Sequence, residues 1–251
     1  MLTVERSKTV DKSKTVARGG LVYEVSHERP FTGRVISWHS NGQKVEEFIY
    51  KNGKRDGKWG YWYRNGQERY QGTYKAGKQV GKLTSWYPNG EKRSEETYLD
   101  GRRDGTWTYW RENGNKMWEK SYRGGKEEGE WTQWNQQGQK QQQGSIKNGK
   151  LDGKFTEWYE NGQKLQQGSY QDGKEAGEWI EWHENGEKRR EGTIKDGKLD
   201  ENGSSGIRTG GSGKEGSSRM ESQLGNGSNG MRAGKSGSKQ LTRMENGMEF
   251  S

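Results

Sequence analysis

A 24-residue period runs through most of this chain and constrains its fold more than any other feature. A tryptophan recurs at this interval, and Asn-Gly (Gln-Gly in one repeat) begins three residues after it. The recurring tryptophans are Trp38, Trp62, Trp86, Trp110, Trp134, Trp158 and Trp182. A fixed period of this length indicates an array built from one supersecondary unit. It favours a surface function over catalysis, because repeat arrays mostly present extended surfaces.

The repeating unit is predicted to be a β-hairpin. Asn-Gly between two aromatic, β-prone runs predicts a type I′ turn, which needs a positive φ at both central residues. A second turn follows twelve residues later, at Asn52-Gly53, Ala76-Gly77, Asp100-Gly101, Gly124-Gly125, Asn148-Gly149, Asp172-Gly173 and Asp196-Gly197. Turns at this spacing leave strands of about six residues and no room for helices. We therefore predict an all-β fold, an elongated single-layer antiparallel β-meander of 24-residue hairpin repeats.

The Asn-Gly turn also predicts the register of each hairpin. A two-residue turn at Asn65-Gly66 sets Trp62 opposite Arg69 and Trp59 opposite Gly72. The second pairing lays a large ring over a cross-strand glycine, a recognised remedy for glycine in a sheet. Trp59 and Trp62 are three residues apart, so simple alternation places them on opposite faces. A bulge would bring them to the same face, and both arrangements remain open at this point.

Aromatic side chains are expected to form the core. Leu, Ile, Val and Phe supply only 27 of 251 residues, a proportion typical of disordered chains, but 12 Trp and 12 Tyr argue for a folded array. Large rings bury much more area than aliphatic side chains, so a thin aromatic core can replace a thick one. On this interpretation Trp110 is a core residue, and Trp110→Ala is expected to destabilise the fold by about 3–5 kcal/mol.

The periodicity divides the chain into segments. Residues 1–20 are expected to be a disordered N-terminal segment, residues 21–40 to form N-terminal cap strands, and residues 41–200 to form the repeat array. Residues 201–251 hold 12 Gly and 10 Ser and lack Trp and Tyr, which predicts a disordered Gly/Ser-rich tail. When residues 228–250 are written as degenerate codons and these are read in a shifted frame, the codons are compatible with the consensus sequence of the repeat. We therefore interpret this tail as frameshifted repeat sequence.

The residue types that usually carry catalysis form no pattern in this sequence. It has no cysteine, no phosphate-binding loop and no nucleophile elbow, and His27, His39 and His183 share no spacing. His39 and His183 stand where other repeats have Tyr, which indicates a structural role. The Asp-Gly turns each offer one carboxylate, too few for calcium. We therefore expect no enzyme activity, no catalytic residue, no cofactor and no metal.

A tyrosine stripe is the candidate contact site for a protein partner. It comprises Tyr61, Tyr63, Tyr87, Tyr109 and Tyr159, which are expected to be exposed. The alternative is that these rings only shield neighbouring strands. The net charge of +9 is distributed along the chain, which predicts no strongly cationic face. Nucleic-acid binding is not expected, because the aromatic rows are better explained as the core.

The repeat motif resembles the bacterial variant of the MORN repeat, in the group of YwqK-family antitoxin components. The segment from Gly153 to Gly177 carries the pattern well, with Trp158, Asn161-Gly162-Gln163-Lys164, Gly168, Tyr170 and Asp172-Gly173-Lys174. The resemblance runs from about residue 21 to residue 200. It implies a non-enzymatic β-ribbon, and the antitoxin group implies binding and neutralisation of a toxin protein. Related eukaryotic arrays are linked to membrane lipids.

Two functions follow as expectations. The first is a scaffold for protein–protein interaction, specifically the antitoxin component of a toxin–antitoxin system. The alternative is a peripheral membrane or cell-envelope surface protein that binds anionic lipid. No apolar run reaches the length of a signal peptide or membrane span, so we expect a cytoplasmic location, or an exported one if the N-terminus is truncated. Oligomerisation through an open edge strand is a further expectation.

Overall fold

The computed structural model describes residues 8–195 and 198–199. In this part the chain forms twenty β-strands and one short 3-10 helix. In chain order they are β1 (Thr9–Asp11), η1 (Lys12–Lys14), β2 (Thr15–Arg18), β3 (Leu21–Glu24), β4 (Gly33–Trp38), β5 (Lys44–Lys51), β6 (Lys54–Trp62), β7 (Glu68–Lys75), β8 (Lys78–Trp86), β9 (Lys92–Leu99), β10 (Arg102–Arg103), β11 (Gly105–Trp110), β12 (Lys116–Arg123), β13 (Lys126–Trp134), β14 (Lys140–Lys147), β15 (Lys150–Leu151), β16 (Gly153–Trp158), β17 (Lys164–Gln171), β18 (Lys174–Trp182), β19 (Lys188–Lys195) and β20 (Lys198–Leu199). None of the described helical residues forms a segment long and apolar enough to cross a membrane.

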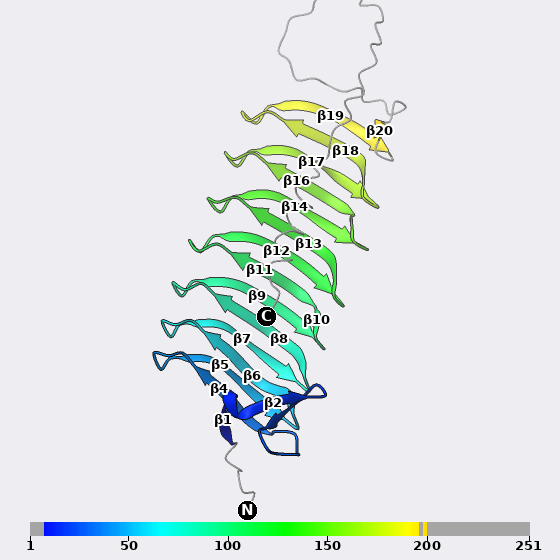
Figure 1. Ribbon diagram of the computed structural model, residues 1–251. Helices are drawn as coiled ribbons and strands as arrows, with labels where there is room; N and C mark the ends of the chain where they lie inside the picture. The colour runs from blue at the N-terminus through cyan, green and yellow to red at the C-terminus, as the bar shows by residue number, and fades with distance from the viewer. Residues whose placement is uncertain (1–7, 196–197, 200–251) are drawn as a thin grey trace, which may run out of the picture. The chain divides into compact units, whose positions relative to one another are not determined.

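One long sheet contains eighteen of the described strands (Figure 1). From β4 onward, strands that follow one another in sequence pair antiparallel, which makes a continuous meander. β10 and β11 both pair with β9, and β15 and β16 both pair with β14, because the strand is interrupted at Asp104 and at Asp152. The predicted all-β meander of hairpin repeats is confirmed.

The Asn-Gly turn is not the predicted type I′ turn. Gly66 has a φ of 84°, but Asn65 keeps a negative φ. The Gly66 N–H donates to the Tyr63 carbonyl at 2.9 Å, and the Tyr63 N–H donates to the Gln67 carbonyl at 2.8 Å. This is a three-residue loop, a type I turn followed by a left-handed glycine. The Asn65 side chain favours it, because its Oδ1 accepts from the Gln67 N–H at 3.1 Å.

This longer loop changes part of the predicted register. Trp62 lies opposite Glu68, and Arg69 is the extra residue of a bulge. The predicted pairing of Trp62 with Arg69 is therefore wrong. The bulge compensates for the added loop residue, so that Trp59 lies opposite Gly72 as predicted. An alanine Cβ at Gly72 would stand 2.8 Å from the Trp59 ring, which confirms the ring over the glycine.

The type I′ geometry belongs to the second turn of each repeat. Asn52 and Gly53 have φ values of 51° and 77°, and Asp100 and Gly101 have 50° and 81°. Five of these turns are tied to the neighbouring repeat by the N–H of their glycine: Gly53, Gly77, Gly101, Gly125 and Gly173. The Gly77 N–H, for example, donates to the Arg55 carbonyl at 2.7 Å. Successive turns therefore form one continuous, hydrogen-bonded edge of the sheet, which we call the turn edge.

The two tryptophan rows lie on opposite faces, as simple alternation predicts. Trp59 belongs to the face that we call the aromatic face, where Trp107 is only 2% exposed. The other face, the ladder face, carries the recurring tryptophans from Trp38 to Trp182, and Trp38 is 54% exposed. Trp110 lies on the ladder face and is partly exposed, so its assignment to the core is wrong. The buried core instead contains Phe48, Trp59, Leu83, Trp107, Phe155 and Trp179.

Lysines cover the tryptophans of the ladder face. Lys44 Nζ lies 4.3 Å from the centre of the Trp62 ring. The same contact recurs in four later repeats, where Lys92, Lys116, Lys140 and Lys164 lie over Trp110, Trp134, Trp158 and Trp182. Several of these lysines also pair with the glutamate three residues later, as Lys116 does with Glu119 at 2.7 Å. These contacts neutralise much of the charge near the tryptophans of this face.

The N-terminal segment is more ordered than expected. Residues 9–18, predicted to be disordered, form β1, η1 and β2. β1 pairs in parallel with β4 and covers the first edge of the sheet, and Val10 is 7% exposed in a cluster with Phe31 and Val35. The segment orders because it satisfies an otherwise open strand edge and buries apolar area. Of the predicted cap, β3 pairs with β2 in a separate small sheet, whereas β4 begins the main sheet. The predicted tail, residues 201–251, lies outside the described residues.

Candidate binding surfaces

Three of the five tyrosines predicted as a contact stripe occupy one repeat position beside the Asn-Gly loop. The hydroxyls of Tyr63, Tyr87 and Tyr159 each donate to the backbone carbonyl of the tryptophan one period further on, at 2.8–2.9 Å. His39 and Arg111 fill the same position in two other repeats and reach the equivalent carbonyl. Burial raises the pKa of the Tyr63 and Tyr87 hydroxyls. Side chains at this position therefore join successive repeats.

The remaining two tyrosines of the stripe lie on the aromatic face. The Tyr61 ring packs edge-on against Phe48 and Trp59. Tyr109, expected to be exposed, is 7% exposed and stacks on Trp118 with ring centres 4.1 Å apart. The structure thus separates the five tyrosines into two sets instead of bringing them into one stripe.

A different row of side chains runs through the middle of the aromatic face. Its members are cross-strand neighbours in register, two from each repeat, and their identity changes from repeat to repeat. We call it the variable row; it consists of Ser37, Glu46, Tyr61, Tyr70, Ser85, Ser94, Tyr109, Trp118, Gln133, Gln142, Glu157, Gln166, Glu181 and Arg190. In the row beside it, on the side of the turn edge, large and mostly aromatic side chains recur in one strand of each hairpin and glycine in most of the others, with Glu96 and Lys120 as exceptions. Members of the variable row in its N-terminal half, such as Ser94, Tyr109 and Trp118, are buried, so its C-terminal half is the part open to solvent.

The C-terminal half of the variable row is polar and accessible. Its residues from Gln133 to Arg190 are only partly buried. Glu157 accepts from two glutamine amides, at 2.8 Å from Gln142 and 2.6 Å from Gln166. The Arg190 guanidinium donates to Glu181 at 2.8 Å. These bonds align amide and carboxylate groups along the row and fix their side chains.

The N-terminal half of the row adjoins a buried carboxylate that sequence reasoning missed. Glu96 is 5% exposed and accepts hydrogen bonds from the hydroxyls of Ser94, Tyr98 and Tyr109. Burial, together with the negative charge of Glu96, raises the pKa of both tyrosines. The one signal in the sequence is a charged residue where most repeats have glycine, as at Gly72. The hydroxyls replace the hydration that this carboxylate loses.

We expect the buried tyrosines to resist ionisation until the array unfolds. Burial is the main cause that raises the pKa of Tyr61 and Tyr170 to about 12, and that of Tyr98 and Tyr109 is raised as well, against an ordinary value of 10.0. The pKa of these tyrosines is higher in the folded than in the unfolded protein. Their contribution to the free energy of unfolding is therefore complete below pH 10, and it is lost as the pH rises from there through the folded pKa. Tyrosinate absorbance during an alkaline titration, compared with the same titration in denaturant, measures the difference in tyrosine pKa between the folded and the unfolded protein. Full ionisation of the folded protein near pH 10 would contradict the burial.

The hairpins that carry these rows also match a known repeat. The family model of the MORN repeat variant matches residues 31–52, 79–100, 151–172 and 176–196. These four segments are MORN repeat variants. Among curated proteins, none matches the chain. Each matched segment is a hairpin around an Asn-Gly loop, and the hairpins between them have the same bulge and register. The array of similar hairpins therefore extends beyond the matched segments.

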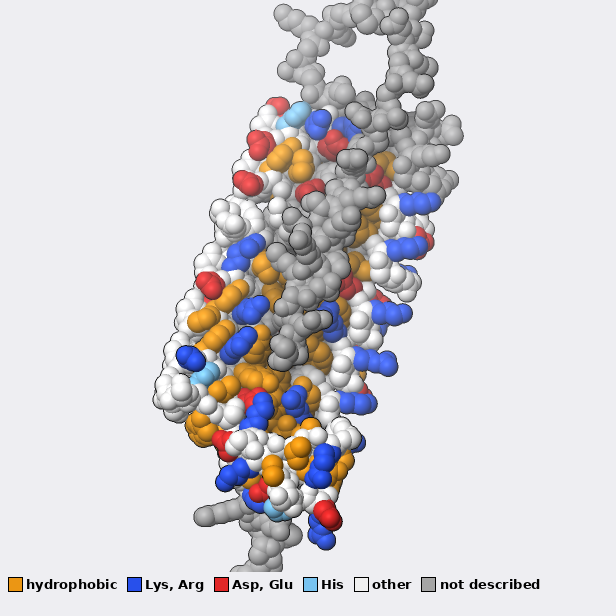
Figure 2. Space-filling model, viewed as in Figure 1, with side chains coloured by type: hydrophobic (Ala, Val, Ile, Leu, Met, Phe, Trp, Pro, Cys, Tyr) orange, Lys and Arg blue, Asp and Glu red, His pale blue; other side chains and the backbone are white. Residues whose placement is uncertain are grey.

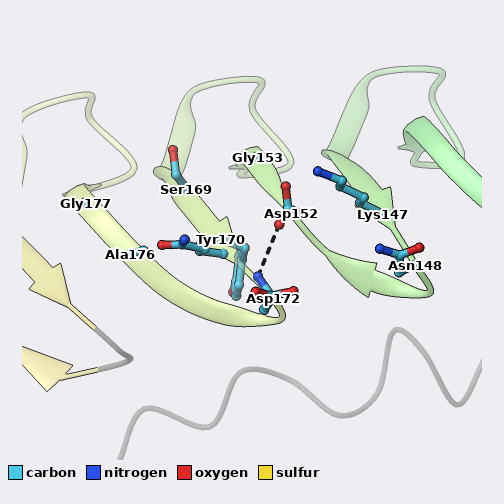
Figure 3. Close-up of a pocket in the computed structure, with 10 residues that line it drawn as sticks. Lys147, Asn148, Asp152, Gly153, Ser169, Tyr170, Asp172, Ala176 and Gly177 are labelled. Carbon is cyan, nitrogen blue, oxygen red and sulfur yellow. Dashed lines mark hydrogen bonds between the residues drawn. The ribbon is translucent and has the colours of Figure 1, made fainter.

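A shallow pocket opens between two turns of the array (Figure 3). It is lined by Lys147, Asn148, Asp152, Ser169, Tyr170 and Asp172, among others. The Asp152 carboxylate faces the turn and accepts from the Asp172 N–H at 3.2 Å. The same contact recurs between Asp56 and Ala76, and between Asp104 and Gly124. The aspartates thus link successive turns to one another, and the described residues hold no cluster of His, Cys, Asp and Glu suited to a metal ion.

Proposed function

We propose that this chain is a non-enzymatic repeat scaffold that binds a protein partner on its aromatic face. The variable row is the observation that carries this proposal. In a repeat array, positions that hold the fold recur, and a row of adjacent positions that do not recur is free to serve recognition. Here that row runs beside a recurring row of large, mostly aromatic side chains, so a partner would contact different side chains of the variable row at each repeat.

The accessible half of the row suits a protein partner in its chemistry. Gln133, Gln142 and Gln166 offer amides, and Glu157 and Glu181 offer carboxylates. The bonds among these side chains hold them in place, which lowers the entropy lost on binding. The buried rings of Phe155 and Trp179 form the floor beside them. Aligned polar groups beside aromatic area are typical of protein–protein interfaces.

The partner that we propose is a toxin protein, which this chain binds and neutralises in the cytoplasm. The support is the resemblance of the 24-residue motif to YwqK-family antitoxin components, together with four MORN-variant matches. Neutralisation by a scaffold needs only a stable contact that covers the active surface of the toxin. A toxin-like reading frame next to the gene is therefore the first partner to test.

Two double variants, one on the aromatic face and one on the ladder face, test this function. The full chain serves as bait in its source cell, with Gln142→Arg and Gln166→Arg combined to alter the variable row. The matched control combines Gln143→Arg and Gln167→Arg, which lie one residue further on in the same strands. Gln143 and Gln167 accept from Lys140 and Lys164 on the ladder face. All four side chains are partly buried glutamines, so the pairs differ mainly in the face that they change.

The expected result is that the wild type and the control retain a co-purifying partner, whereas the variable-row variant loses at least about nine-tenths of it. Where a toxin-like protein is encoded next to the gene, co-expression with it should permit growth with the control and not with the variable-row variant. Equal retention by all three chains would overturn the assignment to the aromatic face. Loss of the partner in the control alone would place binding on the ladder face.

A further inference from the structure

The turn edge gathers positive charge that is dispersed in the sequence. Figure 2 shows Lys and Arg side chains following one another along the right-hand side of the molecule, where the type I′ turns lie. Ten exposed cations flank these turns: Lys51, Lys54, Lys75, Lys78, Arg102, Arg123, Lys126, Lys147, Lys150 and Lys174. We call them the cationic column. The prediction of no strongly cationic surface is wrong here, because the 24-residue period stacks the same turn positions in space.

The cationic column is unfavourable for the isolated array. Lys51 lies directly opposite Lys54, and the same holds for Lys75 with Lys78 and for Lys147 with Lys150. Like charges that face each other across two strands destabilise a hairpin. Within the described ranges, Arg123 is the one member of the column with an ion pair, to Glu128 at 3.0 Å. Lysines of the ladder face, by contrast, pair with glutamates of their own strand. Apart from Arg123, the cations of the column are therefore unpaired among the described residues, and Asp100 and Asp172 in two of the turns offset part of their charge.

The spacing of the column is fixed by the fold. At most of the described turns the glycine N–H donates to the preceding repeat, at 2.7 Å for Gly77 and 2.8 Å for Gly101. The stems of Lys54 and Lys78 lie beside these same glycines. Since each repeat contributes two strands about 4.8 Å apart, neighbouring turns follow at about 9.6 Å. The column thus presents cations at a regular interval on a hydrogen-bonded edge.

This interval matches an extended peptide. A polyproline II helix has three residues per turn and rises about 3.1 Å per residue, so every third side chain recurs on one side after about 9.3 Å. We propose that the turn edge binds an extended acidic segment of a partner protein, with a carboxylate at every third residue. This inference rests on the proposed function, since it assumes a protein partner, and it adds a second contact surface to the variable row.

An extended peptide fits the edge better than a bilayer does. Segments that bind membrane surfaces combine cations with apolar side chains that enter the lipid. Leu99, at 62% exposure, is the one strongly exposed large apolar residue at the described turns of this edge. Each exposed ion pair contributes little in water, so affinity would grow with the number of repeats engaged and fall with added salt.

The test compares two peptides of identical composition against the full chain. The first is a labelled peptide of six Glu-Pro-Pro triplets, and the second carries the same six glutamates in one block followed by twelve prolines. Fluorescence anisotropy at about 50 mM and about 500 mM salt measures their binding. The expected result is binding of the triplet peptide at least about fivefold tighter than the block peptide, and loss of that binding at high salt.

Variants identify the surface that binds the peptide. Combining Lys75→Gln, Lys78→Gln, Lys147→Gln and Lys150→Gln should weaken triplet binding about tenfold. The control, Lys44→Gln with Lys164→Gln on the ladder face, should leave it within about twofold. Equal affinity for the two peptides would overturn the spacing argument. Salt-sensitive binding to phosphatidylserine vesicles that the column variant abolishes, with no peptide binding, would assign the edge to lipid. If neither peptide binds while the variable-row variant still loses its partner, this inference fails and the proposed function stands.

Discussion

Trp107→Ala should destabilise the array by about 3–5 kcal/mol, more than the same change at any tryptophan of the ladder face. Trp107 is 2% exposed and packs between Tyr98 and Tyr122, with ring centres 5.2 and 5.0 Å away. Its Nε1–H donates to the Thr97 carbonyl at 2.9 Å. Alanine would leave a cavity and Arg103 without the ring that it covers at 4.4 Å, and it would remove one of the two hydrogen bonds to the Thr97 carbonyl, which also accepts from the Asp104 N–H at 3.0 Å.

The matched control is Trp110→Ala, which removes the same side chain three residues later in β11. Trp110 is partly exposed on the ladder face, so we expect a loss of only about 1–2 kcal/mol. Denaturant titration followed by circular dichroism gives both free energies of unfolding. Equal losses, or a larger loss for Trp110→Ala, would contradict the assignment of the two tryptophan rows to different faces.

Gly168→Ala should cost about 2–3 kcal/mol, although it adds one methyl group to an ordinary strand backbone. A Cβ at Gly168 would stand 2.3 Å from two atoms in the middle of the Trp179 ring. That ring is 7% exposed and packs edge-on against Tyr170, with centres 5.4 Å apart. It therefore has little freedom to move away, and the strain falls on the packing of both strands.

Gly144→Ala is the control at the same repeat position. Here the nearest atom to an added Cβ is the Trp131 Nε1, at 3.1 Å, on the edge of the ring. A small displacement relieves that contact, so we expect a loss below about 1 kcal/mol. Thermal unfolding of the two variants side by side tests the difference. If Gly168→Ala were as mild as Gly144→Ala, the close approach of ring and glycine would be wrong.

The sequence predicted the architecture because its period is unbroken. Strand pairing in a meander is local, so the spacing of turns fixes which strands are neighbours. The pairing of Trp59 with Gly72 followed from the same spacing. The loop at Asn65-Gly66 was mistaken for type I′ because Asn-Gly suits both loop lengths, and the side chain of Asn65 decides between them through a bond to Gln67.

Burial was harder to predict than pairing. Trp107 and Trp110 are identical residues three positions apart, and periodicity alone does not show which face has more covering neighbours. Val10 gave no periodic signal, yet it is buried because β1 pairs with the edge strand β4. The ordering of that segment depends on its pairing with β4, a non-local contact that a local sequence pattern does not contain.

The binding surfaces were harder still to predict, because their side chains come from different strands. Tyr109 was expected to be exposed and is buried, whereas Gln142 and Gln166, unremarked in the sequence, share the carboxylate of Glu157. Lysines of the turn edge are separated by a full period in the sequence, and only the stacking of repeats makes them a column. In each case the relevant neighbour lies in another strand.

Site-specific cross-linking tests the central claim, that the aromatic face binds the partner, most directly. The chain has no cysteine, so Gln166→Cys and Gln167→Cys each provide one site for a photoreactive label. The two labels sit on neighbouring residues of β17 and point to opposite faces. With the co-purifying partner bound, we predict a covalent adduct from position 166 and little or none from position 167. An adduct from position 167 alone, or equal adducts from both, would contradict the account.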